Sequence, residues 1–148
     1  EITTRLVGSE MCIRDSIDAA ARLFHAVAGE SPFRLFTLLV VVSVVLSAFI
    51  DNIPYVAAML PVVQSIAALM NDGRGMEPYV FYFGLLTGAT LGGNLTPIGA
   101  SANIAAIGLL RKNGETVTTR DFLRIGVPFT LAAVLAGSVY LWLVWGRV

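Results

Sequence analysis

Two short polar stretches interrupt the apolar runs of this chain, and their residue types are those that bind ions inside membranes. Asp51 and Asn52 stand between two apolar runs in SAFIDNIPYV, residues 47–56. The second stretch is GATLGGNLTPIGASAN, residues 88–103. Unwound backbone carbonyls and polar side chains at membrane depth coordinate small cations. The candidate ligands from these two stretches are therefore Asp51, Asn52, Asn94, Thr96, Ser101 and Asn103.

Asp51 is the only charged residue between Arg34 and Asp72. If its turn lies near mid-membrane, an ionised aspartate there costs about 2.5–3.5 kcal/mol on insertion scales. Carboxylates kept at such a cost usually bind an ion or a proton, and one carboxylate that alternates between the two is enough for exchange. If the turn instead reaches the membrane surface, Asp51 is a solvated turn residue with no such role. Spacing alone leaves both interpretations open.

The elements that position these residues are predicted to be a helical hairpin and a broken helix. Pro54 disfavours a helical conformation at the preceding residue, which predicts a hairpin whose tip is 50–53. Gly92 and Gly93 leave helical geometry at little cost, and Thr96 before Pro97 favours an extended backbone. We therefore expect Thr96 to cap a new helix from Pro97 to 110. Irregular backbone at membrane depth is tolerated only inside protein or beside a water-filled cavity.

A simpler alternative exists for the second stretch. Gly84, Gly88, Gly92 and Gly99 follow a spacing that lets membrane helices pack closely. That alternative explains the glycines, but it does not explain the asparagines, threonine, serine and proline among them. The combination favours a binding site.

Composition identifies an all-α integral membrane protein. The chain is 56% hydrophobic and 14% charged, with no net charge, and its mean hydropathy is +0.77. The absence of net positive charge argues against a nucleic-acid partner. A span needs about 20 apolar residues, so only the last apolar run fits one comfortably alone. The apolar runs are 33–50, 53–70, 79–91, 98–110 and 125–145.

Residues 1–16 have no apolar period and are predicted to be a non-native or disordered segment, because RLVGSEMCIRDS resembles translated sequencing-adapter sequence. The only cysteine, Cys12, falls inside it and is uninformative. Residues 17–28 have helical apolar spacing and suit a short helix at the membrane surface. We treat 17–148 as one transport-domain repeat, a fragment of a larger transporter.

Basic residues predict the orientation in the membrane. Loop 111–124 contains Arg111, Lys112, Arg120 and Arg124, whereas Arg74 is the single basic residue of loop 71–78. The positive-inside rule therefore places 111–124 in the cytoplasm and 71–78 outside. Both arms of the hairpin are then rooted at the outer face of a multi-pass protein of the inner (cytoplasmic) membrane.

SAFIDNIPYVAAMLPVV, followed by LGGNLTPIGASANIAAIGLL and DFLRIGVPFTL, resembles the C-terminal part of the ion transporter superfamily. The nearest branch groups arsenite permeases, NhaD-type sodium/proton antiporters and the melanosomal P-protein. The resemblance implies two inverted repeats, each with a re-entrant hairpin and a broken helix, so that the N-terminal repeat is missing here. It also implies a homodimer in the lipid bilayer and no cofactor besides a coupling sodium ion or proton. By the same resemblance, a sodium site would use Ser47, Ile50, Asn52 and a carbonyl near Gly99.

One departure from that superfamily bears on the substrate. Dicarboxylate carriers place Ser-Asn-Thr at the hairpin tip, whereas this tip reads Asp51-Asn52-Ile53. The negative charge would repel a dianion unless a proton or a cation neutralised it. We therefore expect a secondary active transporter that performs sodium/proton exchange or arsenite efflux. The alternatives are a sodium-coupled dicarboxylate or anion symporter and, third, a channel-like non-transporting membrane subunit. We expect no enzyme, because neither Gly-x-Ser-x-Gly nor His-Glu-x-x-His occurs.

Overall fold

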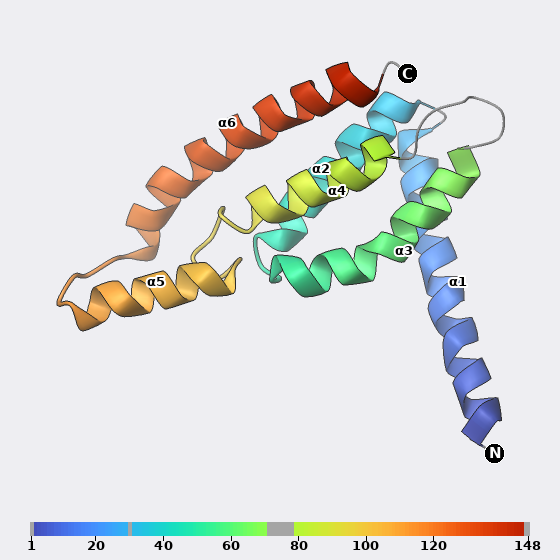
Figure 1. The fold of residues 1–148 in the computed structure, drawn as a ribbon, viewed down its shortest axis with the longest axis horizontal. Coiled ribbons are helices and arrows are strands. Elements are labelled where there is room, and N and C mark those ends of the chain that lie inside the picture. The colour runs from blue at the N-terminus through green and yellow to red at the C-terminus, as the bar shows by residue number, and fades with distance from the viewer. Residues whose placement is uncertain (1, 30, 71–78, 147–148) are drawn as a thin grey trace.

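The computed structural model describes residues 2–29, 31–70 and 79–146, and every regular element within these ranges is an α-helix. This confirms the all-α class. The order of the helices is α1 (Ile2–Ala28), α2 (Pro32–Ser47), α3 (Asn52–Met70), α4 (Tyr79–Gly92), α5 (Ser101–Lys112) and α6 (Thr119–Trp145). Figure 1 shows α2 and α3 as a hairpin, with α4 and α6 running beside it and α5 extending away from it.

The hairpin forms as expected, with its turn shifted slightly toward the N-terminus. Pro32 occupies the first turn of α2, where its missing N–H costs nothing. The turn is 48–51, and α3 begins at Asn52 rather than at Pro54. Pro54 is still tolerated because it lies in the first turn of α3, where backbone N–H groups have no partner inside the helix.

The predicted break between α4 and α5 is confirmed, but the predicted helix start is wrong. Residues 93–100 are not helical, and α5 begins at Ser101 after an extended Ala100 with φ −142° and ψ 140°. Thr96 does not cap the helix, because its hydroxyl donates instead to the carbonyl of Ala48 in the hairpin turn. The backbone turns again where the N–H of Gly99 bonds to the carbonyl of Thr96. These contacts hold the backbone between Thr96 and Gly99 in a non-helical conformation, and α5 begins only after them.

Glycines on α4 bring it into close contact with α2. A Cβ on Gly88 would lie 2.8 Å from the carbonyl oxygen of Val40, and one on Gly92 would lie 2.7 Å from that of Val44. A Cβ on Gly84 would lie 2.8 Å from the ring of Phe36. The close-packing explanation of the glycines is therefore correct for these three positions, alongside the polar site rather than in place of it.

α6 begins at a capping box in which Thr118 and Asp121 bond reciprocally. Its C-terminal half packs on the hairpin root, where the ring of Trp142 meets the ring of Phe33 edge-on at 4.9 Å. Trp145 makes a second ring contact with Tyr79 of α4 at 6.1 Å. These contacts place the end of α6 beside the starts of α2 and α4.

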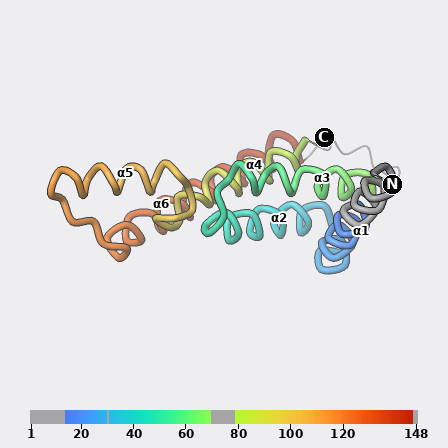
Figure 2. The backbone as a smooth tube through the Cα atoms, turned by 90° about the horizontal axis from the view of Figure 1, so that it is seen from below, coloured from blue at the N-terminus to red at the C-terminus, as the bar shows by residue number. Residues whose placement is uncertain are grey.

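Two helices, α3 over Asn52–Leu69 and α6, are long and apolar enough to cross a membrane. The sequence predicted this for α6, but α3 also qualifies. The 16 residues of α2 reach only about 24 Å, less than the roughly 30 Å of a hydrocarbon core. In both Figure 1 and Figure 2 the hairpin turn lies level with the α4–α5 break, and α5 extends beyond it. This geometry favours a re-entrant hairpin.

α1 is longer than the short surface helix expected over 17–28, and it packs on α3. Ala21 and Ala28 of α1 are buried in the core, and the hydroxyl of Ser65 donates to a carboxylate oxygen of Asp18 at 3.3 Å. The interpretation of residues 1–16 as non-native stays a prediction. The predicted outer loop 71–78 lies outside the described residues.

Candidate functional site

The hairpin turn and the α4–α5 break touch each other directly. The hydroxyl of Thr96 donates to the carbonyl of Ala48. A Cβ on the buried Gly99 would lie 2.8 Å from the oxygen of Ala48 and 3.0 Å from that of Ser47. Only glycine allows this approach, because any larger residue would collide with both carbonyls. The two polar stretches of the sequence, about 50 residues apart in the chain, therefore form one junction.

Asp51 lies at this junction and faces the start of α5. Its carboxylate accepts a hydrogen bond from the backbone N–H of Ser101 at 3.3 Å. The N-terminus of a helix carries a partial positive charge, and Ala100 provides no side-chain cap of its own. Asp51 thus meets the amide-rich end of a helix as expected, although that end is at Ser101 and not at Pro97. The side chain is only partly buried, so it remains accessible to an ion.

Ser47 is buried, and its hydroxyl donates to the carbonyl of Ala89 on α4 at 2.5 Å. One turn earlier, the buried Ser43 accepts a hydrogen bond from Tyr55 of α3 at 3.1 Å. Both serines therefore tie α2 to its neighbours. The hydroxyl oxygen of Ser47 keeps a lone pair that a cation could use, but its proton is already donated.

The side-chain amide of Asn103 is also bonded within the protein. Its amide donates to the carbonyls of Gly93 at 2.9 Å and Thr96 at 3.2 Å. These two bonds hold the non-helical segment against the first turn of α5. The nitrogen of this amide is therefore committed to the loop.

Asn52 and Asn94 differ from the others because both are partly buried and neither side-chain amide is bonded within the described parts of the chain. Asn52 is the neighbour of Asp51 at the start of α3. Together with the carboxylate of Asp51 and the exposed hydroxyl of Ser101, these amides are polar side chains at the junction that could bind an ion.

α6 supplies residues that the sequence analysis did not single out. A Cβ on Gly126 would lie 2.8 Å from the carbonyl oxygen of Asn94, so α6 reaches the break at a glycine. One turn further, Thr130 is fully buried and its hydroxyl has no partner within the described residues. A glycine inside an otherwise apolar helix was the available signal for Gly126. Nothing in the sequence marks Ala48, because it contributes only a backbone carbonyl, whereas Gly93 was already indicated as part of the break.

The junction offers one carboxylate, two free amides and backbone carbonyls. No group of three or more histidine, cysteine, aspartate or glutamate residues occurs among the residues that were described. Oxygen ligands of this kind suit a hard monovalent cation or a proton. The helix N-terminus beside Asp51 offers, in addition, N–H groups that could face an anion.

Comparison with known proteins shows similarity to a family of transporters. Residues 11–148 match the family model described as citrate transporter. The 46 kDa membrane protein of Mycobacterium leprae is 34% identical over 129 residues, which cover 87% of this chain and 30% of that protein. An uncharacterised transporter of Mycobacterium tuberculosis is 40% identical over 127 residues, which cover 86% of this chain and 29% of its own length.

The human P protein is 38% identical over 104 residues, which cover 70% of this chain and 12% of that protein. The chain thus spans less than a third of the length of each of these relatives. No solved structure matches it.

Proposed function

The chain belongs to the citrate transporter family, whose members are membrane transporters, and from this premise we propose that the protein is a secondary active transporter that couples ion movement at Asp51. Membership of this family and the similarity to the P protein confirm the predicted relation to the ion transporter superfamily. The transport activity, the coupling ion and the substrate are proposals for the whole protein.

The observation that carries the proposal is the hydrogen bond from Ser101 to Asp51, which links the hairpin turn to the α4–α5 break. A carboxylate at the contact of two non-helical segments can bind a proton or a cation and change its contact with α5 when it does so. Such a change alters the junction between two elements, which is what coupling of an ion to a conformational change requires.

Our first candidate is sodium/proton exchange, with arsenite efflux as its variant. The carboxylate of Asp51 and the amides of Asn52 and Asn94 supply oxygens for a sodium ion, and backbone carbonyls of the break could complete the set. Protonation of Asp51 would release that ion. Arsenite is a neutral acid near neutral pH, so the charge of Asp51 would not exclude it.

The family description favours a second candidate, symport of an anion such as citrate. The amide-rich start of α5 is suited to a carboxylate substrate, but Asp51 already accepts a hydrogen bond from it at Ser101. Citrate would therefore have to enter together with a cation or a proton that neutralises Asp51.

We further propose that the site is completed by protein outside these 148 residues, namely an N-terminal repeat of the same transporter, and that the protein is a homodimer in the cytoplasmic membrane. All residues of α5 are exposed or only partly buried, and Ile104, Leu109 and Leu110 are exposed apolar side chains. A covering repeat would bury this helix.

The test is flux in proteoliposomes that contain the full-length protein. With a sodium or pH gradient imposed, we expect saturable uptake of radioactive sodium, arsenite or citrate that rises above equilibrium and is stimulated by counter-substrate inside. If the flux of all three solutes stays linear with concentration and none of them accumulates above equilibrium, the protein would be a channel. That result would contradict the proposal. The solute that is accumulated decides between the two candidates.

A further inference from the structure

Two apolar grooves run side by side along the first three turns of α2. One lies between α2 and α6 and encloses about 280 Å³, and the other lies between α1 and α2 and encloses about 330 Å³. Both are lined by Phe33, Thr37 and Val41. These residues are four apart, so they form a ridge along one face of α2 with a groove on each side.

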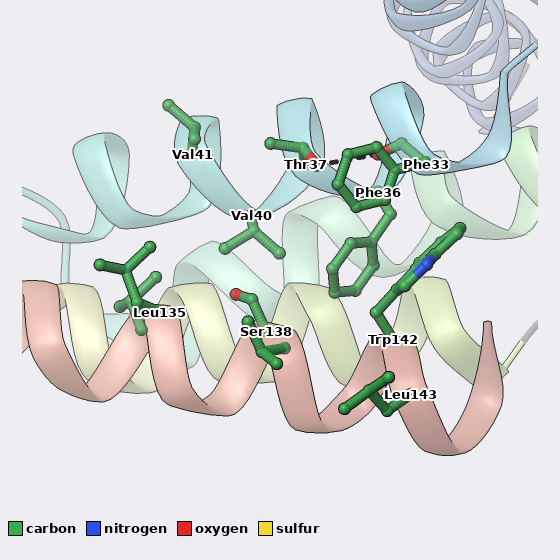
Figure 3. A pocket seen from close by; sticks show the side chains of 11 residues that line it. Phe33, Phe36, Thr37, Val40, Val41, Leu135, Ser138, Trp142 and Leu143 are labelled. Carbon is green, nitrogen blue, oxygen red and sulfur yellow. Dashed lines mark hydrogen bonds between the residues drawn. The ribbon is translucent and has the colours of Figure 1, made fainter.

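The groove between α2 and α6 is lined mostly by apolar side chains. Phe36 and Val40 of α2 face Leu135 and Trp142 of α6 across it, as Figure 3 shows. The ring of Trp142 contacts the ring of Phe33 at the end nearest the start of α2.

One polar atom beside this groove has no partner. The hydroxyl oxygen of Ser138 is buried and makes no hydrogen bond to any described residue, and Figure 3 shows it on the side of α6 that faces α2. A buried hydroxyl without a partner is unfavourable. Thr37 cannot satisfy it as a donor, because its own hydroxyl donates to the carbonyl of Phe33 at 2.9 Å. This oxygen is shielded from the groove, so it is not available to a molecule that lies there.

Arg34 is the one charged side chain among the described residues that line either groove. It is exposed in the first turn of α2, next to the ridge residue Phe33. Ser31, which precedes α2, makes no side-chain hydrogen bond to the helix end. A guanidinium beside free amide groups matches a phosphate.

We propose that a glycerophospholipid of the bilayer straddles this ridge, with one acyl chain in each groove and its phosphate on Arg34. Two apolar grooves that share a ridge and a single cationic group at one end reproduce the shape of a molecule with two chains and one phosphate. Trp142 lies at the same end, where the headgroup region of a membrane favours aromatic rings. The proposal does not depend on which solute is transported.

The test is photo-crosslinking to the full-length protein in membranes. The probe is phosphatidylglycerol with a diazirine in one acyl chain, and adducts are mapped by mass spectrometry. Wild-type protein is expected to carry adducts on peptides that contain 33–41 and 134–143. Val41→Trp fills both grooves and should lower the yield at least fivefold. Val45→Trp is the matched control, because Val45 is one turn further along α2, equally exposed and outside both grooves.

A second comparison tests the headgroup contact. Diacylglycerol with the same diazirine chain lacks the phosphate, so wild-type protein should crosslink the phospholipid at least threefold better. Arg34→Gln should remove that preference, whereas Arg22→Gln, at an exposed arginine of α1 that lines neither groove, should keep it.

Absence of adducts on these peptides would mean that another protein segment covers the grooves, and it would overturn the proposal. Equal losses in Val41→Trp and Val45→Trp would do the same. A phospholipid preference that survives Arg34→Gln would overturn the assignment of the phosphate to this residue.

Discussion

Asn103 and Asn52 carry the same amide, but only that of Asn103 is bonded within the described ranges of the chain. Asn103 donates to two carbonyls of the break, and its loss would remove this partner from Gly93, whereas the carbonyl of Thr96 would keep the N–H of Gly99. Asn52 is partly buried at the hairpin turn and makes no such bond. The sequence predicted both as ligands, and the structure separates a residue that holds the loop from one that is free to bind.

We predict that Asn103→Ala lowers both stability and transport, while Asn52→Ala lowers transport alone. Leaving the carbonyl of buried Gly93 without its partner costs about 1–3 kcal/mol, so the melting temperature of full-length Asn103→Ala protein should fall in scanning fluorimetry. Asn113→Ala, at the exposed end of α5, is the control and should match the wild type in both assays. A wild-type melting temperature for Asn103→Ala would contradict the bonding described here.

Local sequence signals were sufficient for some helix ends but not for contacts between helices. Gly92 and Gly93 correctly predicted where α4 ends, and Pro54 predicted the start of α3 two residues too late. Thr96 before Pro97 has the local pattern of a cap, yet its hydroxyl bonds to Ala48 in the hairpin turn. A hydrogen bond across 48 residues of chain has no signature in either segment. That is why the start of α5 was predicted four residues too early.

At the scale of elements, the packing of α4 on α2 holds the hairpin turn against the break. Gly84, Gly88 and Gly92 let the two backbones approach, and the polar junction lies just beyond the last of them. In the sequence, close packing by the glycines and ion binding by the polar residues were alternative explanations of the same segment. In the structure they serve successive parts of one interface.

Gly88→Val is therefore expected to disrupt this interface. Its Cβ would lie 2.7 Å from the Cβ of Ser43 and 2.8 Å from the carbonyl oxygen of Val40, and overpacking of this kind costs about 1–3 kcal/mol. The yield of monodisperse full-length protein in size-exclusion chromatography should fall. Thr90→Val places the same side chain on the exposed face of α4 and should leave the yield unchanged. Similar losses in both variants would argue against a special role for the α2–α4 contact.

At the scale of the whole molecule, the hairpin turns back level with the break, while the α4–α5 path and α6 continue past it (Figures 1 and 2). We propose that the path through α4 and α5 crosses the membrane, which would place the start of the hairpin and the end of α5 at opposite membrane faces. The distribution of lysine and arginine predicts the same orientation. What covers the apolar side chains of α5 could not be predicted from these 148 residues, because no described residue buries them.

Cysteine labelling of the full-length protein tests this orientation in a background that carries Cys12→Ser. Asn113→Cys should react with an impermeant maleimide only in inside-out vesicles. Arg74→Cys, at a position outside the described residues, should react in intact cells. Reaction of both cysteines from the same side would contradict the hairpin topology.

The central claim is that Asp51, at the junction of the hairpin turn and the break, is the carboxylate that couples transport, and its most direct test is the pH dependence of transport by Asp51→Asn. The amide keeps the shape of the side chain and removes the titrating group. We predict that full-length Asp51→Asn folds normally but that its initial transport rate no longer varies with pH. Glu115→Gln, at an exposed carboxylate after α5, should keep the wild-type profile. A wild-type pH profile in Asp51→Asn would contradict the account and would favour a permease for a neutral substrate such as arsenite.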